Sequence, residues 1–243
     1  MTPPVRAATG ARQNQLLAAL PEAEWGRWQA HLEPVDLALG QVLCESGSVP
    51  EYAYFPITAI VSLVCVTQDG ASAEVAVVGH EGVVGISLFM GGVGTPSRAV
   101  VHNAGQGYRL RAQVVKSEAL CAGPVLAVLL RYTLSLIAQM AQTAACNRYH
   151  SIDQLLCRRL LMGLDRLPSS DIVMTQELAS SLLGVRREGV TAAASKLQQA
   201  GVIRYSRGRI AVLDRERLEQ LTCEFHVGAK KTHLAPLPLS AVP

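Results

Sequence analysis

The chain of 243 residues has few charges, few aromatic side chains and no paired-cysteine motif. Charged residues make up 17% of the chain and aromatic residues 5%, whereas hydrophobic residues reach 49%. This composition excludes an intrinsically disordered chain and indicates a globular one. The net charge of +3 is too small to indicate a nucleic-acid partner by itself, so the distribution of charge along the chain matters more than its total.

The six cysteines are scattered over the whole length, and no two of them form a Cys-x-x-Cys pair. They are Cys44, Cys65, Cys121, Cys146, Cys157 and Cys223. The scatter predicts free, mostly buried thiols in a reducing cytosol, without a metal or iron–sulfur site. The sequence also lacks a catalytic Ser/His/Asp order, a phosphate loop ahead of a helix with lysine, and metal-ligand spacing. We therefore expect no enzyme and no resident cofactor.

Long uninterrupted apolar runs are missing too. The most apolar stretch, Ala119 to Leu130, is broken by Gly123 and Pro124 and stays below the eighteen residues needed to span a bilayer. The first fifteen residues contain no apolar segment of the kind a secretion signal needs. We expect a soluble, cytoplasmic protein with no membrane partner.

Short strand-like segments fill the region between residues 34 and 111. They are rich in valine, isoleucine and tyrosine, and glycines, prolines and an Asp69-Gly70 hairpin signal separate them. The segments are 35–39, 41–44, 52–55, 60–66, 73–78, 98–102 and 108–111. Their spacing predicts an all-β sandwich or small barrel. A short helical region from Leu16 to His31, interrupted by Pro21, precedes it.

A long helix is predicted from Val125 to Arg148, because this stretch contains neither glycine nor proline. Spacings that alternate between four and three residues give it a seam typical of a two-stranded coiled coil. The seam consists of Leu126, Leu130, Thr133, Ile137, Met140 and Ala144. A second apolar flank, with Leu129, Leu134 and Leu136, lets the helix pack on its own β domain and on a second chain at once. We expect a homodimer; a core helix packed inside one chain is the alternative.

The segment from Met174 to Asp214 carries the strongest functional pattern. Thr175 is placed to cap a helix, Gly184 gives the backbone freedom for a tight turn, and a second helix follows. Two β-type runs flank the basic turn Arg207-Gly208 and form a predicted wing. Between Arg186 and Arg209, six basic residues stand against one acidic residue, a surplus of five that exceeds the +3 of the whole chain. This concentration of charge indicates contact with phosphates.

The exposed residues of these helices and of the wing are the predicted DNA contacts. A recognition helix presents its N-terminal residues to base edges, where arginine reads guanine and glutamate accepts from cytosine. The predicted contacts are Thr175, Gln176, Arg186, Arg187, Glu188, Thr191, Ser195, Lys196, Arg204, Arg207 and Arg209.

The segment Thr175 to Ile203 (T-Q-E-L-A-S-S-L-L-G-V-R-R-E-G-V-T-A-A-A-S-K-L-Q-Q-A-G-V-I) resembles the helix-turn-helix of the Crp/Fnr superfamily of bacterial transcription regulators. The resemblance covers roughly residues 15–225 and includes the base-reading pair Arg187-Glu188. It departs from the family at Ala192, where many members carry a further arginine, so the operator need not match the usual one.

The resemblance implies an α+β protein with an N-terminal, jelly-roll-like β-roll and a C-terminal winged helix-turn-helix. It places a cyclic-nucleotide-binding-like sensor domain at 15–124, a dimerisation helix at 125–148, the DNA-binding domain at 149–225 and a disordered tail at 226–243. It also implies double-stranded DNA, a second copy of the chain and RNA polymerase as partners.

The stretch Gly82 to Val100 resembles the family's phosphate-binding cassette. Arg98 matches the arginine that pairs with the cyclic phosphate, but Gly85 stands where nucleotide-binding members hold the ribose with a glutamate. The implied effector-binding residues are Gly85, Ser97, Arg98 and Thr133. Because glycine offers no carboxylate to a buried hydroxyl, we expect no response to cyclic AMP. A different, unidentified small-molecule effector is the expected signal.

Two functions remain open at this point. In the first, the chain is a dimeric transcription regulator that reads a pseudo-palindromic operator. In the second, it is a regulatory interaction module whose winged helix binds protein instead of DNA. Salt distinguishes them, because DNA affinity falls steeply as counterions compete for the phosphates.

Overall fold

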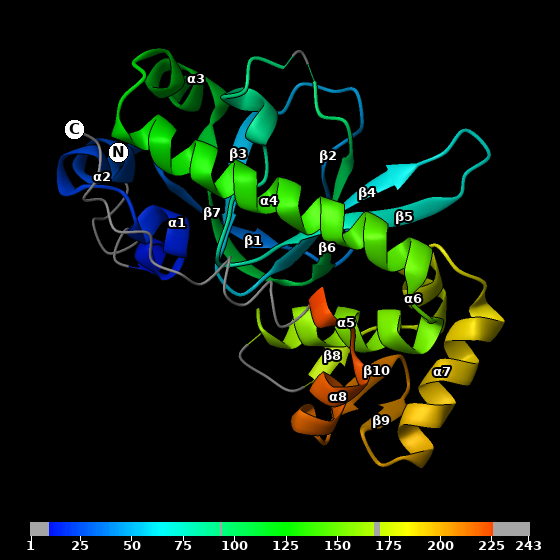
Figure 1. The fold of residues 1–243 in the computed structure, drawn as a ribbon. Helices are drawn as coiled ribbons and strands as arrows, with labels where there is room; N and C mark the ends of the chain where they lie inside the picture. Colours follow the sequence, from blue (N-terminus) through cyan, green and yellow to red (C-terminus); the bar gives the residue numbers. More distant parts are fainter. Residues whose placement is uncertain (1–9, 93, 168–170, 226–243) are drawn as a thin grey trace.

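The computed structural model describes residues 10–92, 94–167 and 171–225 and arranges them in two lobes (Figure 1). The upper lobe holds most of the strands, and the long helix α4 runs across it from one end to the other. The lower lobe holds the helices that follow α4 and a small sheet. This mixed architecture, with a β-roll, a long helix and a C-terminal helix-turn-helix, confirms the predicted fold class.

The N-terminal lobe begins with short helices and continues as strands. Its elements are α1 (Gln15–Ala18), α2 (Glu22–Trp28), η2 (Gln29–His31), β1 (Glu33–Leu37), β2 (Val42–Cys44), β3 (Tyr52–Pro56), β4 (Ile60–Val66), β5 (Ser72–Val78), η3 (Ile86–Leu88), β6 (Arg98–Asn103), β7 (Gly105–Arg111) and α3 (Ala112–Leu120). The strands form two antiparallel sheets with the orders β1-β7-β3 and β2-β6-β4-β5. Helix α3 is an element that the sequence did not predict.

Two apolar clusters hold this lobe together. One lies between the sheets and includes Val61, Val78 and Leu136 of α4. The other lies under the N-terminal helices, where the fully buried Trp28 meets Phe55 edge-on at 6.0 Å between ring centroids. Burial of such large side chains is the main stabilising contribution to a lobe of this size.

Helix α4 (Pro124–Tyr149) begins with proline in its first turn, where the missing N–H costs nothing. Its bounds extend the predicted helix by one residue at each end. One face packs on the β-roll through Val125, Leu129 and Leu136, which are almost fully buried. Gln139 of the same face bonds the backbone of Val77 with both ends of its amide. The predicted apolar flank against the β domain is therefore confirmed for Leu129 and Leu136, but it is wrong for Leu134, which is 68% exposed.

Helix α4 also corrects the expectation that no apolar stretch is long enough to span a membrane. Among the helices of the described residues, it is the one whose length and composition pass that test, with a mean hydropathy of 1.5. A third of the tested window, 33%, is buried inside this chain. Length and composition alone are weak evidence for a span, because the packed helix of a soluble protein meets them too.

The C-terminal lobe contains α5 (Ile152–Leu164), β8 (Asp171–Val173), α6 (Gln176–Leu183), α7 (Arg187–Gln199), β9 (Ile203–Ser206), β10 (Arg209–Val212) and α8 (Arg215–Leu221). Ser151 caps α5 in a reciprocal capping box with Gln154, as the sequence predicted for Ser151. The strands form a small antiparallel sheet in the order β8-β10-β9. The predicted disordered tail, 226–243, lies outside the described residues.

Two buried ion pairs join the lobes. Glu74 of β5 meets Arg159 of α5 at 2.7 Å, and Glu81 meets Arg166 at 2.8 Å; all four side chains are more than nine-tenths buried. The tip of the β4–β5 hairpin also touches α6, where the Ser72 hydroxyl lies 2.7 Å from that of Ser181. The β-roll is thus attached to the C-terminal lobe through charged groups that water does not reach.

Candidate DNA-binding surface and sensor pocket

Helices α6 and α7 form a helix-turn-helix whose local structure follows from its sequence. The Thr175 hydroxyl accepts the N–H of Leu178 and caps α6. Gly184 ends α6 with a φ of 64°, in the left-handed region that favours glycine. Val185 packs between the helices, and its carbonyl accepts the Ser180 hydroxyl at 2.9 Å. These contacts fix the angle at which α7 leaves the turn.

Helix α7 has one buried and one exposed side. Val190, Ala193 and Leu197 are buried in the core of the lobe. Gly189 lets α7 approach α5 closely, since a Cβ there would lie 2.6 Å from the side chain of Ile152. The opposite side is exposed and carries Arg186, Arg187, Glu188, Thr191, Ser195 and Lys196. The structure brings these predicted contacts together on one helix face.

The wing lies beside this face. Arg207 and Gly208 both have positive φ, 50° and 73°, so β9 and β10 are joined by a tight two-residue turn of the kind that suits a twisted hairpin. Arg204, Arg207 and Arg209 are exposed on this hairpin. Within the described part of the chain, no carboxylate lies within 4 Å of these three or of the two arginines that begin α7. Their charges face solvent.

Four predicted contacts have local partners, and one of them is Ser195, whose hydroxyl accepts a hydrogen bond from the Gln199 side chain at 3.4 Å. The Lys196 ammonium pairs with Asp153 of α5 at 2.9 Å, and the Thr191 hydroxyl bonds the Arg187 carbonyl one turn earlier. Thr175 serves as the cap of α6, and Gln176 behind it is half-buried. The free positive charge therefore gathers at the start of α7 and on the wing.

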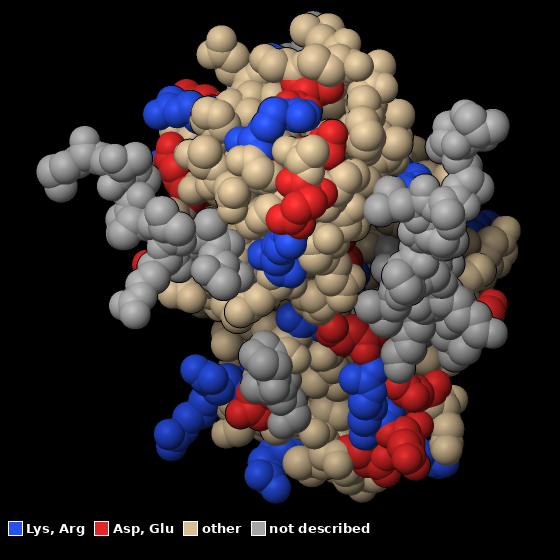
Figure 2. Space-filling model, turned by 90° about the vertical axis from the view of Figure 1, so that its left-hand side faces the viewer, with Lys and Arg blue, Asp and Glu red and all other residues tan. Residues whose placement is uncertain are grey.

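The side of the molecule that lies on the left in Figure 1 differs from this region. Figure 2 shows the side of the molecule turned away from α7, and there acidic and basic side chains lie next to one another instead of forming a single field. A surface of mixed sign attracts a polyanion weakly. The basic residues near α7 therefore differ from the charged residues on that side, because they are exposed and nearly all of one sign.

The pocket at the expected effector position is nearly filled. It is a cavity of about 30 Å³, room for little more than a water molecule, whereas small-molecule sites span about 300–1,000 Å³. Its lining is mainly apolar, with Tyr52, Tyr54, Leu136 and Met140 among the side chains that occupy it. Of the four predicted effector residues, Gly85 and Ser97 line this cavity.

The other two predicted effector residues do not line it. Arg98 forms an ion pair with Glu45 at 3.3 Å, so the guanidinium expected to meet a phosphate has a carboxylate partner. Thr133 is buried, and its hydroxyl bonds the Leu129 carbonyl one turn earlier in α4. Gly85 has a φ of 110°, a backbone conformation that a glutamate there would strain. The backbone conformation at Gly85 therefore explains why no glutamate stands at this position to bind a ribose hydroxyl.

Glu81 lies four residues before Gly85, and its carboxylate already has a partner in the C-terminal lobe. Burial by itself favours its neutral form, yet the Arg166 guanidinium and backbone N–H groups hold the pKa of Glu81 below its ordinary value. It serves as the buried carboxylate that binds the C-terminal lobe.

The exposed face of α4 includes Leu130 and Ile137 of the predicted seam, together with Leu134, which the sequence places on the flank against the β domain. Leu130, Leu134 and Ile137 are the large apolar residues on it, with exposed fractions of 46%, 68% and 50%. Two residues assigned to the seam lie elsewhere: Thr133 is buried within the chain, and the half-buried Met140 packs against the β-roll. The physical reason is that both sides of α4 are apolar, so the heptad pattern alone does not determine which side faces the β-roll.

A buried polar network surrounds the junction between the lobes. The Ser62 hydroxyl donates to Glu74, and His102 Nδ1 meets the same hydroxyl, so the neutral ring carries its proton on Nδ1. Burial, together with the nearby Arg159, lowers the pKa of His102 from 6.5 to about 3. The imidazole is therefore neutral at every physiological pH.

The cysteines are less scattered in space than in sequence. Cys146, His150 and Cys223 place one ligand-type atom each within 4.8 Å of the others. Burial raises the pKa of Cys146 to about 12. The expectation that the cysteines form no ligand cluster is wrong, because α4 and α8 bring together residues that are 77 positions apart.

Comparison with known proteins agrees with this architecture. Residues 154–221 match the family model described as the Crp-like helix-turn-helix domain. No curated protein sequence matches the chain. Among solved structures, a putative Crp/Fnr-family regulator from Eubacterium rectale superposes with a TM-score of 0.68 at 16% identity, covering 86% of this chain and 98% of that one.

Two further relatives show the same fold. FixK2 from Bradyrhizobium japonicum has a TM-score of 0.65 at 17% identity, over 79% of this chain and 98% of its own. The c-di-GMP-responsive global regulator CLP of Xanthomonas campestris has a TM-score of 0.62 at 15% identity, over 79% and 99%. The class is therefore defined: a β-roll joined by a long helix to a winged helix-turn-helix. Within that class, the chain has the fold of Crp/Fnr transcription regulators and carries their Crp-like helix-turn-helix domain.

Proposed function

We propose that this chain is a homodimeric, sequence-specific DNA-binding transcription regulator that acts on a pseudo-palindromic operator. The observation that carries the proposal is a group of five exposed arginines at the start of α7 and on the wing, which have no carboxylate partner among the described residues: Arg186, Arg187, Arg204, Arg207 and Arg209. Free guanidinium groups release counterions from DNA phosphates when they bind, which drives association.

The residues proposed to contact the DNA bases lie at the N-terminal end of α7. A helix of this motif enters the major groove with that end against the bases, where Arg187 has the fork geometry for guanine and Glu188 accepts from cytosine. The wing arginines are placed to hold the backbone and set the register. Lys196, already paired with Asp153, contributes less.

Dimerisation is supported by the exposed apolar stripe on α4. Leu130, Leu134 and Ile137 follow one another at spacings of four and three residues on a helix whose other side is covered by the β-roll. A second copy of the chain packed along this stripe would place two recognition helices on one side of the DNA. Half-sites one helical turn apart, about 34 Å, then follow.

The sensing function is proposed to differ from cyclic AMP binding. The small cavity, the Arg98–Glu45 pair and the positive φ of Gly85, which would strain a glutamate, each argue against a cyclic nucleotide there. Relatives include a protein named as a c-di-GMP-responsive regulator, so the fold accepts other signals.

The test is a gel-shift titration on an operator selected from random duplex DNA, without added nucleotide. Arg187→Ala is expected to weaken binding by about 5- to 150-fold for each half-site, the effect of losing one bidentate base contact of about 1–3 kcal/mol, and to relax selectivity at one base pair per half-site. Arg217→Ala, an exposed arginine on α8, is the matched control and leaves affinity unchanged.

Equal affinity of wild type and Arg187→Ala would contradict the base-reading assignment. Binding that does not weaken between 50 and 200 mM salt, or selection that enriches no DNA sequence, would instead favour the protein-binding module. These outcomes are distinct because only phosphate contacts produce a steep salt dependence.

A further inference from the structure

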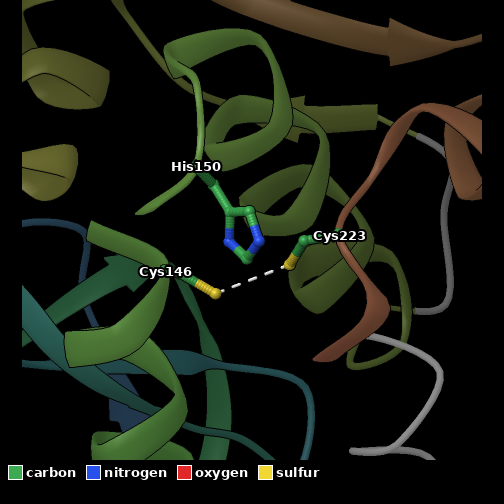
Figure 3. A group of neighbouring side chains, drawn as sticks. All are labelled: Cys146, His150 and Cys223. Atoms are coloured by element: carbon green, nitrogen blue, oxygen red, sulfur yellow. Dashed lines mark hydrogen bonds between the residues drawn. The ribbon is translucent and has the colours of Figure 1, made fainter. Parts of the chain in front are cut away.

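A group of ligand-type side chains lies far from both the recognition helix and the sensor cavity. Cys146 is in the last turn of α4, His150 follows that helix directly, and Cys223 follows α8. Figure 3 shows the three side chains converging from different elements. The two Sγ atoms are 3.5 Å apart, and the three ligand-type atoms lie within 4.8 Å of one another.

These spacings match those of a tetrahedral zinc site. With Zn–S bonds of about 2.3 Å, two thiolates on one tetrahedral ion lie about 3.8 Å apart, so the sulfur atoms need to move by only a few tenths of an ångström. Two thiols and an imidazole are the donors that zinc prefers over calcium or magnesium. Cys146 and His150 stand four residues apart, so both project from one side of the chain at the end of α4.

A carboxylate that could complete the set lies next to His150. Oε2 of Glu224 is 3.3 Å from Nε2 of His150, and its side chain is 71% exposed, so this carboxylate can turn toward an ion. The buried Nδ1 of His150 has no hydrogen-bond partner among the described residues. A buried imidazole nitrogen without a hydrogen-bond partner is unfavourable in an ordinary apolar core, and coordination to a metal ion would satisfy it.

We propose that Cys146, His150 and Cys223, completed by Glu224, bind one Zn²⁺ per chain. On binding, the two thiols lose their Sγ–H protons to solvent and coordinate as thiolates. The ion would hold the end of α4 against the segment that follows α8 and so fix the orientation of the C-terminal lobe. The site stands apart from the proposed DNA function, and neither proposal depends on the other.

Cobalt substitution tests the site in the full-length chain. The protein, reduced and freed of metal with a chelator, is titrated with Co²⁺, and absorption reports both tetrahedral geometry and thiolate-to-metal charge transfer. We expect one Co²⁺ per chain with two thiolate ligands, displaced by an equivalent of Zn²⁺. Zinc is also expected to raise the melting temperature, and the stabilisation should grow with the logarithm of its free concentration over the dissociation constant.

Variants assign the ligands. Cys146→Ser and Cys223→Ser are expected to lose the charge-transfer band of the missing sulfur together with tight binding, whereas Cys65→Ser, which alters an exposed cysteine on β4, leaves both unchanged. Glu224→Ala changes an exposed side chain, so it tests the fourth ligand without disturbing the core. It is expected to weaken metal binding while the metal-free melting temperature stays the same.

Three results would overturn the proposal. The first is a folded, reduced wild-type chain that binds no Co²⁺ or Zn²⁺. The second is a cobalt spectrum without a thiolate band. The third is an equal loss of binding in Cys65→Ser. Because the first two use the wild-type chain, they hold even if a buried cysteine variant fails to fold.

Discussion

The two functional regions of this molecule hold their charged residues in opposite ways. At the start of α7 and on the wing, five arginines are exposed without carboxylate partners. In the β-roll, Arg98 is paired with Glu45, and Glu81 is buried against Arg166. The first region is prepared for an external polyanion, whereas the second has its charges satisfied internally.

Two proteins with the same fold need not bind the same ligand. The β-roll keeps the shape of a nucleotide-binding module, yet tyrosine, leucine and methionine side chains fill its cavity. Function must be argued from the site, and here the site argues for DNA at one end and against a cyclic nucleotide at the other.

The largest effect is expected where the two regions meet. Arg159→Ala leaves Glu74 buried without its charge partner, so the free energy of unfolding should fall by about 3–5 kcal/mol in a urea titration. Lys196→Ala, which breaks the exposed pair with Asp153, is the control and should cost at most about 1 kcal/mol. A similar loss of unfolding free energy in both variants would mean that water reaches the Glu74–Arg159 ion pair.

The next effect concerns the exposed stripe of α4. Leu134→Asp places a carboxylate in the proposed dimer interface and should raise the dimer dissociation constant about 30-fold or more, equivalent to about 2 kcal/mol. Analytical ultracentrifugation measures it. Leu120→Asp, at an apolar residue that is 87% exposed on α3, should leave the dimer intact. A dimer that tolerates Leu134→Asp would remove α4 from the interface.

A smaller effect is expected from pH. The folded chain keeps His102 neutral down to about pH 3, while the unfolded chain protonates it near its ordinary pKa of 6.5. The unfolded state therefore binds more protons between these values, and stability should fall by up to about 1.4 kcal/mol for each pH unit below 6.5. His102→Asn should flatten that part of the curve of unfolding free energy against pH. An unchanged slope would show that His102 is accessible to protons in the folded chain.

The smallest effect is expected in the sensor. Arg98→Ala removes a half-exposed ion pair, so stability should change by less than about 1 kcal/mol. Operator affinity, measured with and without cyclic AMP, should match that of wild type. If cyclic AMP changes the operator affinity of wild type and Arg98→Ala abolishes that change, the β-roll binds a cyclic nucleotide through Arg98 and the proposed difference between the two regions is wrong.

Local patterns explain what the sequence predicted well. The second helix of the motif was expected from about Arg186 to Gln199 and is found from Arg187 to Gln199, because caps and a glycine turn define its ends within a few residues. Helix α4 was placed within one residue at each end for a similar reason: proline begins it and no breaker follows. Strand β4 was predicted with its observed bounds from β-branched residues alone.

Features that depend on distant residues were not predicted. The phase of α4 depends on what covers it, and so Thr133 was assigned to the seam although the fold buries it. The pairing of Glu74 with Arg159 joins residues from different lobes and left no local signal. The spacing of Cys146 and His150, four residues apart at the end of a helix, was a signal that could have been used. Only folding brings Cys223 to them.

The central claim is that α7 reads DNA in a dimer that needs no cyclic nucleotide. Footprinting of the selected operator, in the absence of nucleotide, tests it most directly. The account predicts two symmetric protected half-sites whose centres lie about 34 Å apart on one face of the duplex. A single asymmetric footprint, or protection that appears only when cyclic AMP is added, would contradict it.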